Sequence, residues 1–144
     1  MGHLRRLTLA KKQRLVKNRQ FRAVLDHRKR VSDGLLVMYV APNHCTWPRL
    51  GISVGRSCGS AVVRNRFKRL IRESFRLEQD QWPDGWDILV MVNSRWRSQY
   101  EASEKNEQNK VGLEHVRRSL LGLRGRAEKR RWFEPGLLEE RGDG

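Results

Sequence analysis

The sequence has few cysteines and no long apolar run. Cys45 and Cys58 stand thirteen positions apart, without a CxxC spacing or a neighbouring pair of histidines, so we expect no zinc site. Cations interrupt the apolar residues near the N-terminus, which therefore do not resemble a secretory signal; this favours reduced thiols in the cytoplasm over a disulfide. No apolar run approaches the roughly 18 residues of a membrane span, so we expect a soluble protein without membrane contact. An organelle-targeting peptide in the basic first 31 residues is the alternative.

Acidic residues are scarce and unevenly placed. The 144 residues include 16 Asp and Glu against 31 Lys and Arg, which gives a formal net charge of +15. Residues 1–31 hold eleven Lys and Arg against the single acid Asp26, and residues 49–76 hold eight against Glu73. Two separated segments therefore create a strong positive field, which attracts phosphate backbones in a salt-dependent manner.

Groups that could catalyse a reaction on their own are missing from the basic segments. A nuclease acting alone would need metal-binding carboxylates or a histidine acid and base pair. Most acids fall in turns, in the polar stretch 94–110 or near the C-terminus, and the histidines are dispersed at positions 3, 27, 44 and 115. The glycines at positions 51, 55 and 59 match no phosphate-binding loop. We therefore expect no catalytic residues and no tightly bound metal or cofactor in this chain.

What the sequence does contain is a basic segment with helical periodicity, residues 61–76. At about 100° per residue, one arc collects Val63, Phe67, Leu70, Ile71, Ser74 and Phe75, and the other collects Arg64, Asn65, Arg66, Lys68, Arg69, Arg72 and Arg76. Cations spaced four residues apart repel each other, and cations in the first turns oppose the helix dipole. These charges gain the helix little stability, so they favour contact with a polyanion over a merely solvated face.

Periodicity and capping residues predict one α+β domain. The expected elements are a helix over 18–27 with Asn18 as N-cap, strands over 35–40 and 49–56, the basic helix over 61–78 capped by Ser60, a strand over 87–92 and a helix over 113–123. The first two strands are expected to pair as a hairpin, and the most apolar strand, 87–92, is expected in the centre of the sheet. Residues 1–13 are expected to form a basic flexible arm, residues 14–123 the domain, and residues 124–144 a disordered tail.

The run from Gly59 to Arg76, GSAVVRNRFKRLIRESFR, resembles the signature of the bacterial ribonuclease P protein subunit. That signature is an Arg-Asn-Arg triplet followed by Lys-Arg and Arg-Glu. The resemblance extends over residues 14–123. It implies an αβββαβα fold with a central, mostly antiparallel four-stranded sheet packed by helices and a left-handed βαβ crossover, as in one domain of a ribosomal protein. The strand count from periodicity is then one short.

The resemblance also implies a function. In this family the RNA subunit performs the metal-dependent hydrolysis that removes the 5′ leader of precursor tRNA, and Mg²⁺ is required by the holoenzyme rather than bound tightly by the protein. The expected partners are the catalytic RNA and precursor tRNA, with no protein oligomer required. The expected contacts with the RNA subunit are Arg64, Asn65, Arg66, Lys68, Arg69, Arg72 and Arg76, and those with the 5′ leader are Arg14, Lys17, Phe21, Val37, Tyr39 and Arg56.

Two departures from the family pattern weaken the expected leader contacts. Only one cation, Arg56, follows the second strand where the family usually has two, and Leu25 stands where the family often has a second aromatic residue. The alternative to leader contact for Phe21 is that it is an ordinary residue of the hydrophobic core. The alternative function is that of a non-enzymatic RNA-binding or ribosomal protein, while the strand expected at residues 50–54 argues against a DNA-binding helix-turn-helix.

Overall fold

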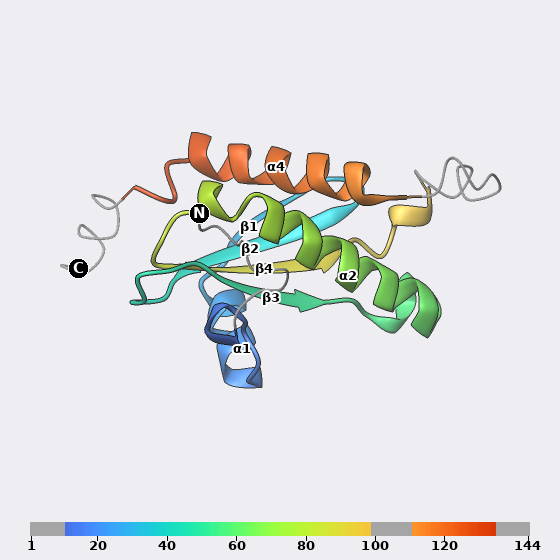
Figure 1. Ribbon diagram of the computed structural model, residues 1–144, viewed down its shortest axis with the longest axis horizontal. Coiled ribbons are helices and arrows are strands. Elements are labelled where there is room, and N and C mark those ends of the chain that lie inside the picture. The colour runs from blue at the N-terminus through green and yellow to red at the C-terminus, as the bar shows by residue number, and fades with distance from the viewer. Residues whose placement is uncertain (1–10, 99–110, 135–144) are drawn as a thin grey trace, which may run out of the picture.

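The computed structural model describes residues 11–98 and 111–134. In this part of the chain, three α-helices, four strands and three short 3₁₀ turns follow one another (Figure 1). Their bounds are η1 Lys11–Gln13, α1 Asn18–Asp26, β1 Lys29–Ser32, β2 Leu36–Pro42, β3 Arg49–Ser53, η2 Arg56–Cys58, α2 Ala61–Leu77, η3 Gln79–Gln81, β4 Trp86–Val92 and α4 Leu113–Lys129. The predicted α+β class and the element order of the family are both confirmed.

The four strands form one mixed sheet in the order β1-β2-β4-β3. β1 and β4 each pair with β2 in the antiparallel sense, whereas β3 pairs with β4 in parallel. β4 therefore lies inside the sheet, as its apolar sequence predicted, and six of its seven residues are buried. Because side chains alternate along a strand, Ile88 and Val90 point to one face while Leu89 and Met91 point to the other.

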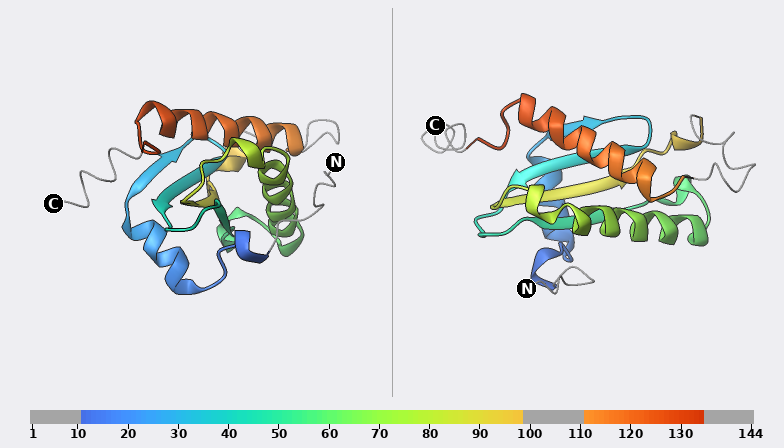
Figure 2. Two further views of the ribbon diagram at one scale, coloured as in Figure 1. Left: turned by 60° about the vertical axis from the view of Figure 1, so that its left-hand side comes forward. Right: turned by 45° about the horizontal axis from the view of Figure 1, so that its top comes forward.

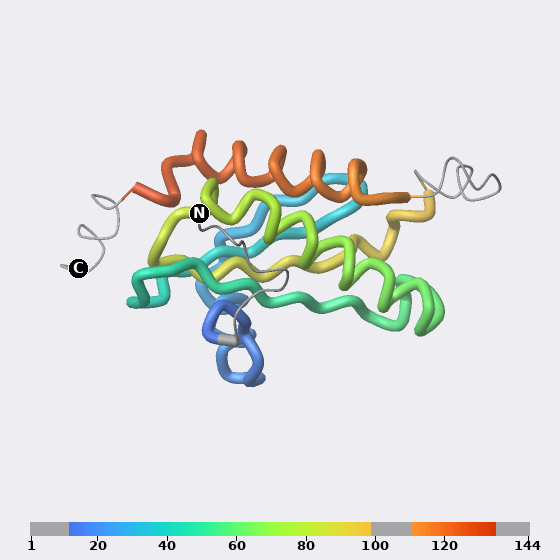
Figure 3. Tube along the Cα trace, viewed as in Figure 1, coloured from blue at the N-terminus to red at the C-terminus, as the bar shows by residue number. Residues whose placement is uncertain are grey.

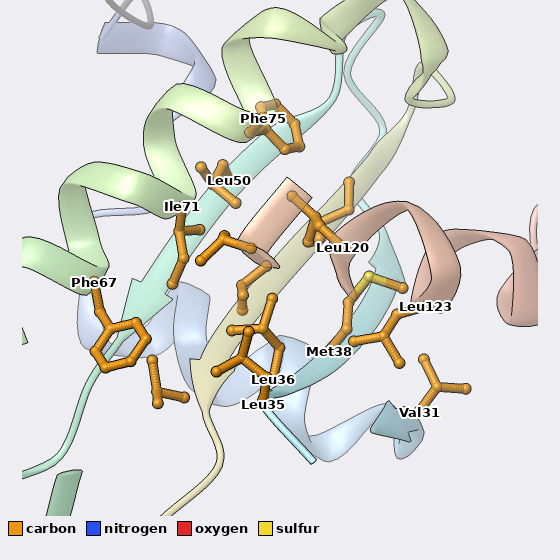
Figure 4. Close-up of a cluster of buried hydrophobic side chains, with 14 of the residues drawn as sticks. Val31, Leu35, Leu36, Met38, Leu50, Phe67, Ile71, Phe75, Leu120 and Leu123 are labelled. Carbon is orange, nitrogen blue, oxygen red and sulfur yellow. The ribbon is translucent and has the colours of Figure 1, made fainter. Parts of the chain in front are cut away.

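Helices α2 and α4 cover one face of the sheet, and α1 lies against the other (Figures 1 and 2). The larger core lies beneath α2 and α4. Figure 4 shows Phe67, Ile71 and Phe75 of α2 and Leu120 and Leu123 of α4 in one cluster over the same face of the sheet. The apolar arc predicted for the basic helix is thus its buried face, so the cationic arc is directed away from the core.

A smaller core lies on the face covered by α1. It consists of the buried residues Leu15, Val24, Ala41 and Leu89, against which Phe21, Tyr39 and Met91 pack with partial exposure. α1 has only nine residues, so it covers only part of the sheet. The rest of this face remains open to solvent between α1 and the strands.

The connection β3-α2-β4 joins two adjacent parallel strands by a left-handed crossover. In Figure 1 both strands run to the right, α2 passes in front of the sheet, and β4 lies above β3, which is the left-handed arrangement. The tube in Figure 3 follows the same path. Such connections are right-handed in about 98% of cases, so the residues themselves gave no reason to expect this hand. The expectation drawn from the family resemblance is confirmed.

The hairpin predicted between the strands expected at 35–40 and 49–56, which are β2 and β3 in the structure, is wrong. β2 and β3 do not pair, because β4 lies between them and forms ladders with both. β4 is apolar on both faces, so burial on two sides favours the central position over an edge. The strand missing from the periodicity analysis is β1, whose sequence KRVS offers a single buried apolar residue, Val31.

Both ends of the domain extend further than expected. Residues 11–13 of the predicted flexible arm form η1, which Trp47 holds by donating a hydrogen bond from Nε1 to the carbonyl of Lys12 at 3.0 Å. At the other end α4 continues to Lys129, and the Phe133 ring packs edge-on against Trp86 with centroids 5.2 Å apart. The predicted tail is therefore ordered as far as residue 134. Residues 1–10, 99–110 and 135–144 lie outside the described part.

Three smaller predictions can also be compared with the structure. The N-cap of α1 is Lys17 rather than Asn18, and its backbone N–H donates to Oε1 of Gln20 at 2.9 Å. Cys45 and Cys58 are both free thiols, as predicted. Among the described residues, no helix is long and apolar enough to cross a membrane.

Candidate nucleic-acid interface

Helix α2 is positioned by its cap and by its apolar stripe. Ser60 is the N-cap, and its Oγ accepts a hydrogen bond from the backbone N–H of Val63 at 3.3 Å, which confirms the predicted cap. Three aromatic or aliphatic anchors, Phe67, Ile71 and Phe75, are at most 3% exposed. A helix fixed along one side presents the residues of its other side to solvent, and here those residues carry the charge.

The structure divides the predicted cationic arc into two groups. Asn65, Arg69 and Arg72 are exposed. Arg64, Arg66, Lys68 and Arg76 are partly buried. The exposed group is available to a partner without any change of fold.

Two of the partly buried arginines have roles within the protein. Arg66 donates from Nη2 to the carbonyl of Val111 at 2.7 Å and so ties α2 to the segment that leads into α4. Arg76 forms an ion pair with Glu73 one turn earlier. The hydrogen bond between them lowers the pKa of the Glu73 carboxyl and raises the pKa of Arg76. These two arginines therefore contribute to folding as well as to the positive field.

A polar groove of about 280 Å³ runs between α2 and the segment that precedes α1. Its cations are Arg14, Lys68 and Arg72, and its other lining residues are apolar: Leu15, Val16, Leu50 and Ile52. Arg14 reaches this place because the chain beside it pairs with the outer edge of β3, where the N–H of Leu15 donates to the carbonyl of Leu50 at 2.9 Å. The sequence had assigned Arg14 to the leader cleft, whereas the structure places it beside the basic helix.

A second cleft, of about 250 Å³, lies between α1 and the sheet. Phe21 lines it from α1, together with residues that the sequence had not singled out: Asn18, Leu25, Ile52, Ser53, Leu89 and Met91. Tyr39 and Val37 belong to the same face, because they pair directly with Leu89 and Met91. The alternation of side chains along β4 was the signal that could have identified Leu89 and Met91 as residues of this face.

The remaining two candidates for the leader cleft, Lys17 and Arg56, are exposed. Lys17 is at the start of α1, and Arg56 is the first residue of η2 beyond the end of β3. Neither lines the cleft, so these side chains could act only at its approaches. Phe21 both packs on the small core and lines the cleft, so its two interpretations are compatible.

Gly51 of β3 lies beneath Leu15 and Phe21, and it allows both to approach the sheet. A Cβ at this position would lie 2.9 Å from Cδ1 of Leu15 and 2.9 Å from Cε1 of Phe21. We expect Gly51→Val to lower the free energy of unfolding by about 1–3 kcal/mol because the site is overpacked. Urea denaturation measures this change. The control Gly55→Ala, whose Cβ would meet only Ser57 Oγ at 3.9 Å, should leave the midpoint nearly unchanged, and equal midpoints for both variants would contradict the packing described here.

A buried carboxylate, Asp87 of β4, links β4 to Arg49 at the start of β3 and to Asn43 just after β2. This carboxylate was not identified from the sequence. Asp87 is 5% exposed and accepts hydrogen bonds from Arg49 Nε at 2.7 Å, from Arg49 Nη2 at 2.9 Å and from Asn43 Nδ2 at 2.9 Å. The hydrogen bond with Asp87 raises the pKa of Arg49. Asn43 also donates to the carbonyl of Trp47 at 3.2 Å. Because Trp47 holds Lys12, this network orders the backbone two residues before Arg14.

Within residues 11–98 and 111–134, no three His, Cys, Asp or Glu side chains gather in a way that could hold a metal ion. The described surface offers instead a cationic helix, a basic groove and a half-open cleft with aromatic rings. Fold and site together define a small α+β domain with a cationic helix over one edge of a mixed sheet.

Comparison with known proteins identifies the family. The model of the Ribonuclease P family matches residues 9–116. The ribonuclease P protein component of Clostridium botulinum is 38% identical over 108 residues, which cover 72% of this chain and 97% of the relative. That of Clostridium kluyveri is 42% identical over 106 residues, or 69% of this chain and 95% of the relative. The chain belongs to the ribonuclease P protein family.

Solved structures support the same assignment. The ribonuclease P protein of Staphylococcus aureus superposes with a TM-score of 0.66 at 27% identity, covering 80% of this chain and 94% of that one. The protein from Thermotoga maritima superposes with a TM-score of 0.65 at 32% identity, covering 76% and 93%. The matches thus include nearly the whole of the known proteins.

Proposed function

We propose that this chain is the protein subunit of ribonuclease P, which binds the catalytic RNA and the 5′ leader of precursor tRNA and assists removal of the leader. The observation that carries the proposal is the groove that Arg14, Lys68 and Arg72 line together with apolar residues. The groove brings cations from two separate segments to one place. The family assignment supplies the identity of the anion.

Contact with the RNA subunit is assigned to the outward side of α2. Arg69 and Arg72 are exposed there, and Lys68 lines the groove one position earlier. Glu73 is the single acid of this helix, and Arg76 engages it. Each cation that neutralises a phosphate releases a counterion, so binding should weaken steeply as salt is added.

Contact with the leader is assigned to the cleft beside α1. Phe21 lines the cleft, and Tyr39 is on the same face of the sheet with its side chain partly exposed. Aromatic rings in such a position can stack on unpaired bases, which contributes about 1–3 kcal/mol per base. The leader is single-stranded, so its bases are free to stack.

The chemistry is assigned to the RNA. Hydrolysis requires Mg²⁺, which the holoenzyme supplies through its RNA, while the protein contributes charge and orientation. No protein oligomer is needed for this role. In a bacterium the substrate is transcribed in the cytoplasm, which is where we place the protein.

Removing two exposed cations of α2 tests the RNA contact. We expect Arg69→Ala/Arg72→Ala to weaken binding to a labelled bacterial ribonuclease P RNA and to reduce the salt slope by about 0.7–0.9 log units for each phosphate that is no longer neutralised. Filter binding across a salt series measures both effects. The melting temperature should stay nearly constant because both side chains are exposed.

The matched control is Arg95→Ala/Arg118→Ala, which removes the same charge from exposed positions outside α2. A slope equally reduced in this control would show that net charge alone sets binding. A second assay addresses catalysis: wild-type protein should let a bacterial ribonuclease P RNA cleave precursor tRNA at lower Mg²⁺ than the RNA needs alone. Failure to lower that requirement with a cognate RNA would leave a plain RNA-binding protein as the better description.

A further inference from the structure

A second cationic surface lies where the end of α4 meets β1. We call it the β1-edge surface and define it by Lys29 of β1, Arg126 and Lys129 of the last turn of α4, and Arg130 and Trp132 just beyond. The C-terminal part of α4 packs against β1, and Arg126 donates from Nη1 to the carbonyl of Ser32. Residues almost a hundred positions apart in the sequence thus form one patch.

The centre of the β1-edge surface is the indole ring of Trp132. Two cations lie near the same ring: Lys29 Nζ is 5.4 Å from its centroid and Arg130 Cζ is 5.2 Å away. Trp132 is half-buried against the main core, and its backbone N–H donates to the carbonyl of Ala127 at 3.2 Å. The chain beyond the helix is therefore held in place, and both cations lie within 5.4 Å of the centre of the ring that it carries.

Two of the described carboxylates near this surface are engaged with other arginines. Glu128 pairs with Arg124 at 3.2 Å, and Glu134 pairs with Arg131 at 2.9 Å. The helix dipole accounts for Arg126 and Lys129 in the last turn and for Arg130 at the C-cap, but not for Lys29 of β1.

The β1-edge surface and the groove lie at opposite edges of the sheet. β1 and β3 are the two edge strands, α4 packs over β1 and β2, and α2 packs over β3. Figure 2 shows β1 and the end of α4 on one side of the molecule and α2 on the other. A single nucleic-acid segment that occupies the α2 groove would leave the β1-edge surface uncovered.

The family assignment does not account for this surface. The family match ends at residue 116, within the first turn of α4, whereas four of the five residues of the surface follow position 125. Its role must therefore be argued from its own chemistry. The surface consists of four cationic side chains near one aromatic ring. Such a group of positive charges can neutralise the phosphates of a nucleic-acid backbone.

We propose that the β1-edge surface is a second RNA-binding site, which contacts the phosphodiester backbone of a structured RNA separately from α2. The proposal rests on the proposed function, because it takes RNA as the partner. Lys129 and Arg130 supply the phosphate contacts. The Trp132 ring positions Arg130 and Lys29 through the cation-π contacts described above. With cations at both edges, the domain bridges two RNA segments instead of lying on one.

The test uses Lys129→Gln/Arg130→Gln in the full chain. Both side chains are exposed, so the melting temperature should not change. We expect the salt slope for a labelled bacterial ribonuclease P RNA to fall by about 0.7–0.9 log units for each phosphate that the variant no longer neutralises. Arg95→Gln/Arg118→Gln removes the same charge elsewhere and should keep the wild-type slope. Titrating the assembled holoenzyme with precursor tRNA forms a second arm, which shows whether the phosphates belong to the RNA subunit or to the substrate.

Each outcome has one meaning. The second site is supported if the salt slope falls in either arm for Lys129→Gln/Arg130→Gln but not for the Arg95→Gln/Arg118→Gln control. Wild-type slopes in both arms, or the same reduction in the control, overturn it. The α2 variant Arg69→Ala/Arg72→Ala, titrated alongside, separates the two proposals: if it loses affinity while the Lys129/Arg130 variant does not, RNA binding by α2 stands and the second site fails.

Discussion

Replacing Trp96 by alanine should lower the free energy of unfolding by about 3–5 kcal/mol, the range for a buried large aromatic residue. Trp96 is 1% exposed, and its ring meets Phe67 of α2 edge-on with centroids 4.9 Å apart. Its Nε1 donates to the carbonyl of Cys58 at 2.9 Å. The substitution therefore creates a cavity and also leaves a buried carbonyl without its donor.

Trp96→Phe separates these two contributions. It keeps an aromatic ring against Phe67 but removes the N–H that reaches Cys58, so the unpaired carbonyl should cost about 1–3 kcal/mol. Chemical denaturation of both variants gives the comparison. A cost for Trp96→Ala no greater than that for Trp96→Phe would mean that the ring contributes little packing. Because Phe67 anchors the first half of α2, weaker RNA binding should accompany the loss of stability.

Replacing Asp87 by alanine should have the second largest effect, about 3 kcal/mol of unfolding free energy, at the low end of the range for breaking a buried ion pair. The low end applies because one fifth of the Arg49 side chain is exposed and water can solvate it. The variant leaves the Arg49 guanidinium without its bidentate partner and Asn43 without one acceptor.

The double variant Arg49→Met/Asp87→Ala identifies the cause. It removes the unpaired charge together with the carboxylate, so it should unfold at higher denaturant than Asp87→Ala alone. A double variant no more stable than Asp87→Ala would show that the unpaired Arg49 charge is not the cause of the loss. The Asp87 network also orders Trp47 and, through it, Lys12. Asp87→Ala should therefore weaken RNA binding as well, by loosening the backbone beside Arg14.

The sequence was sufficient for α2 because every signal for that helix is local. Its cap, its apolar stripe and its cationic arc lie within eighteen consecutive residues, and each lies where the periodicity placed it. The same holds for β4, whose apolar run already implied burial on both faces. The cationic arc that we propose contacts RNA could be predicted from this one segment, together with the family signature that it carries.

Features that depend on distant partners could not be predicted in this way. β1 has one buried side chain and becomes a strand only because β2 offers it a free edge. Trp96 lies in a stretch that looks polar, and Trp132 in one that looks irregular, yet each packs on residues far away in the sequence. Arg14 was expected at the leader cleft but lines the groove beside α2, because its position is set by pairing with β3.

The pairing of the N-terminal segment with β3 also bears on how the protein survives before it meets a partner. An open edge strand is a template for the strands of other molecules, and it invites aggregation. Here the carbonyl of Leu50 on the outer edge of β3 is already bonded to Leu15, and Arg126 bonds the carbonyl of Ser32 at the short, charged β1. Neither edge offers a long uncharged ladder to a second chain. Both edges of the sheet therefore leave a second chain little backbone to pair with, which lowers the tendency to aggregate.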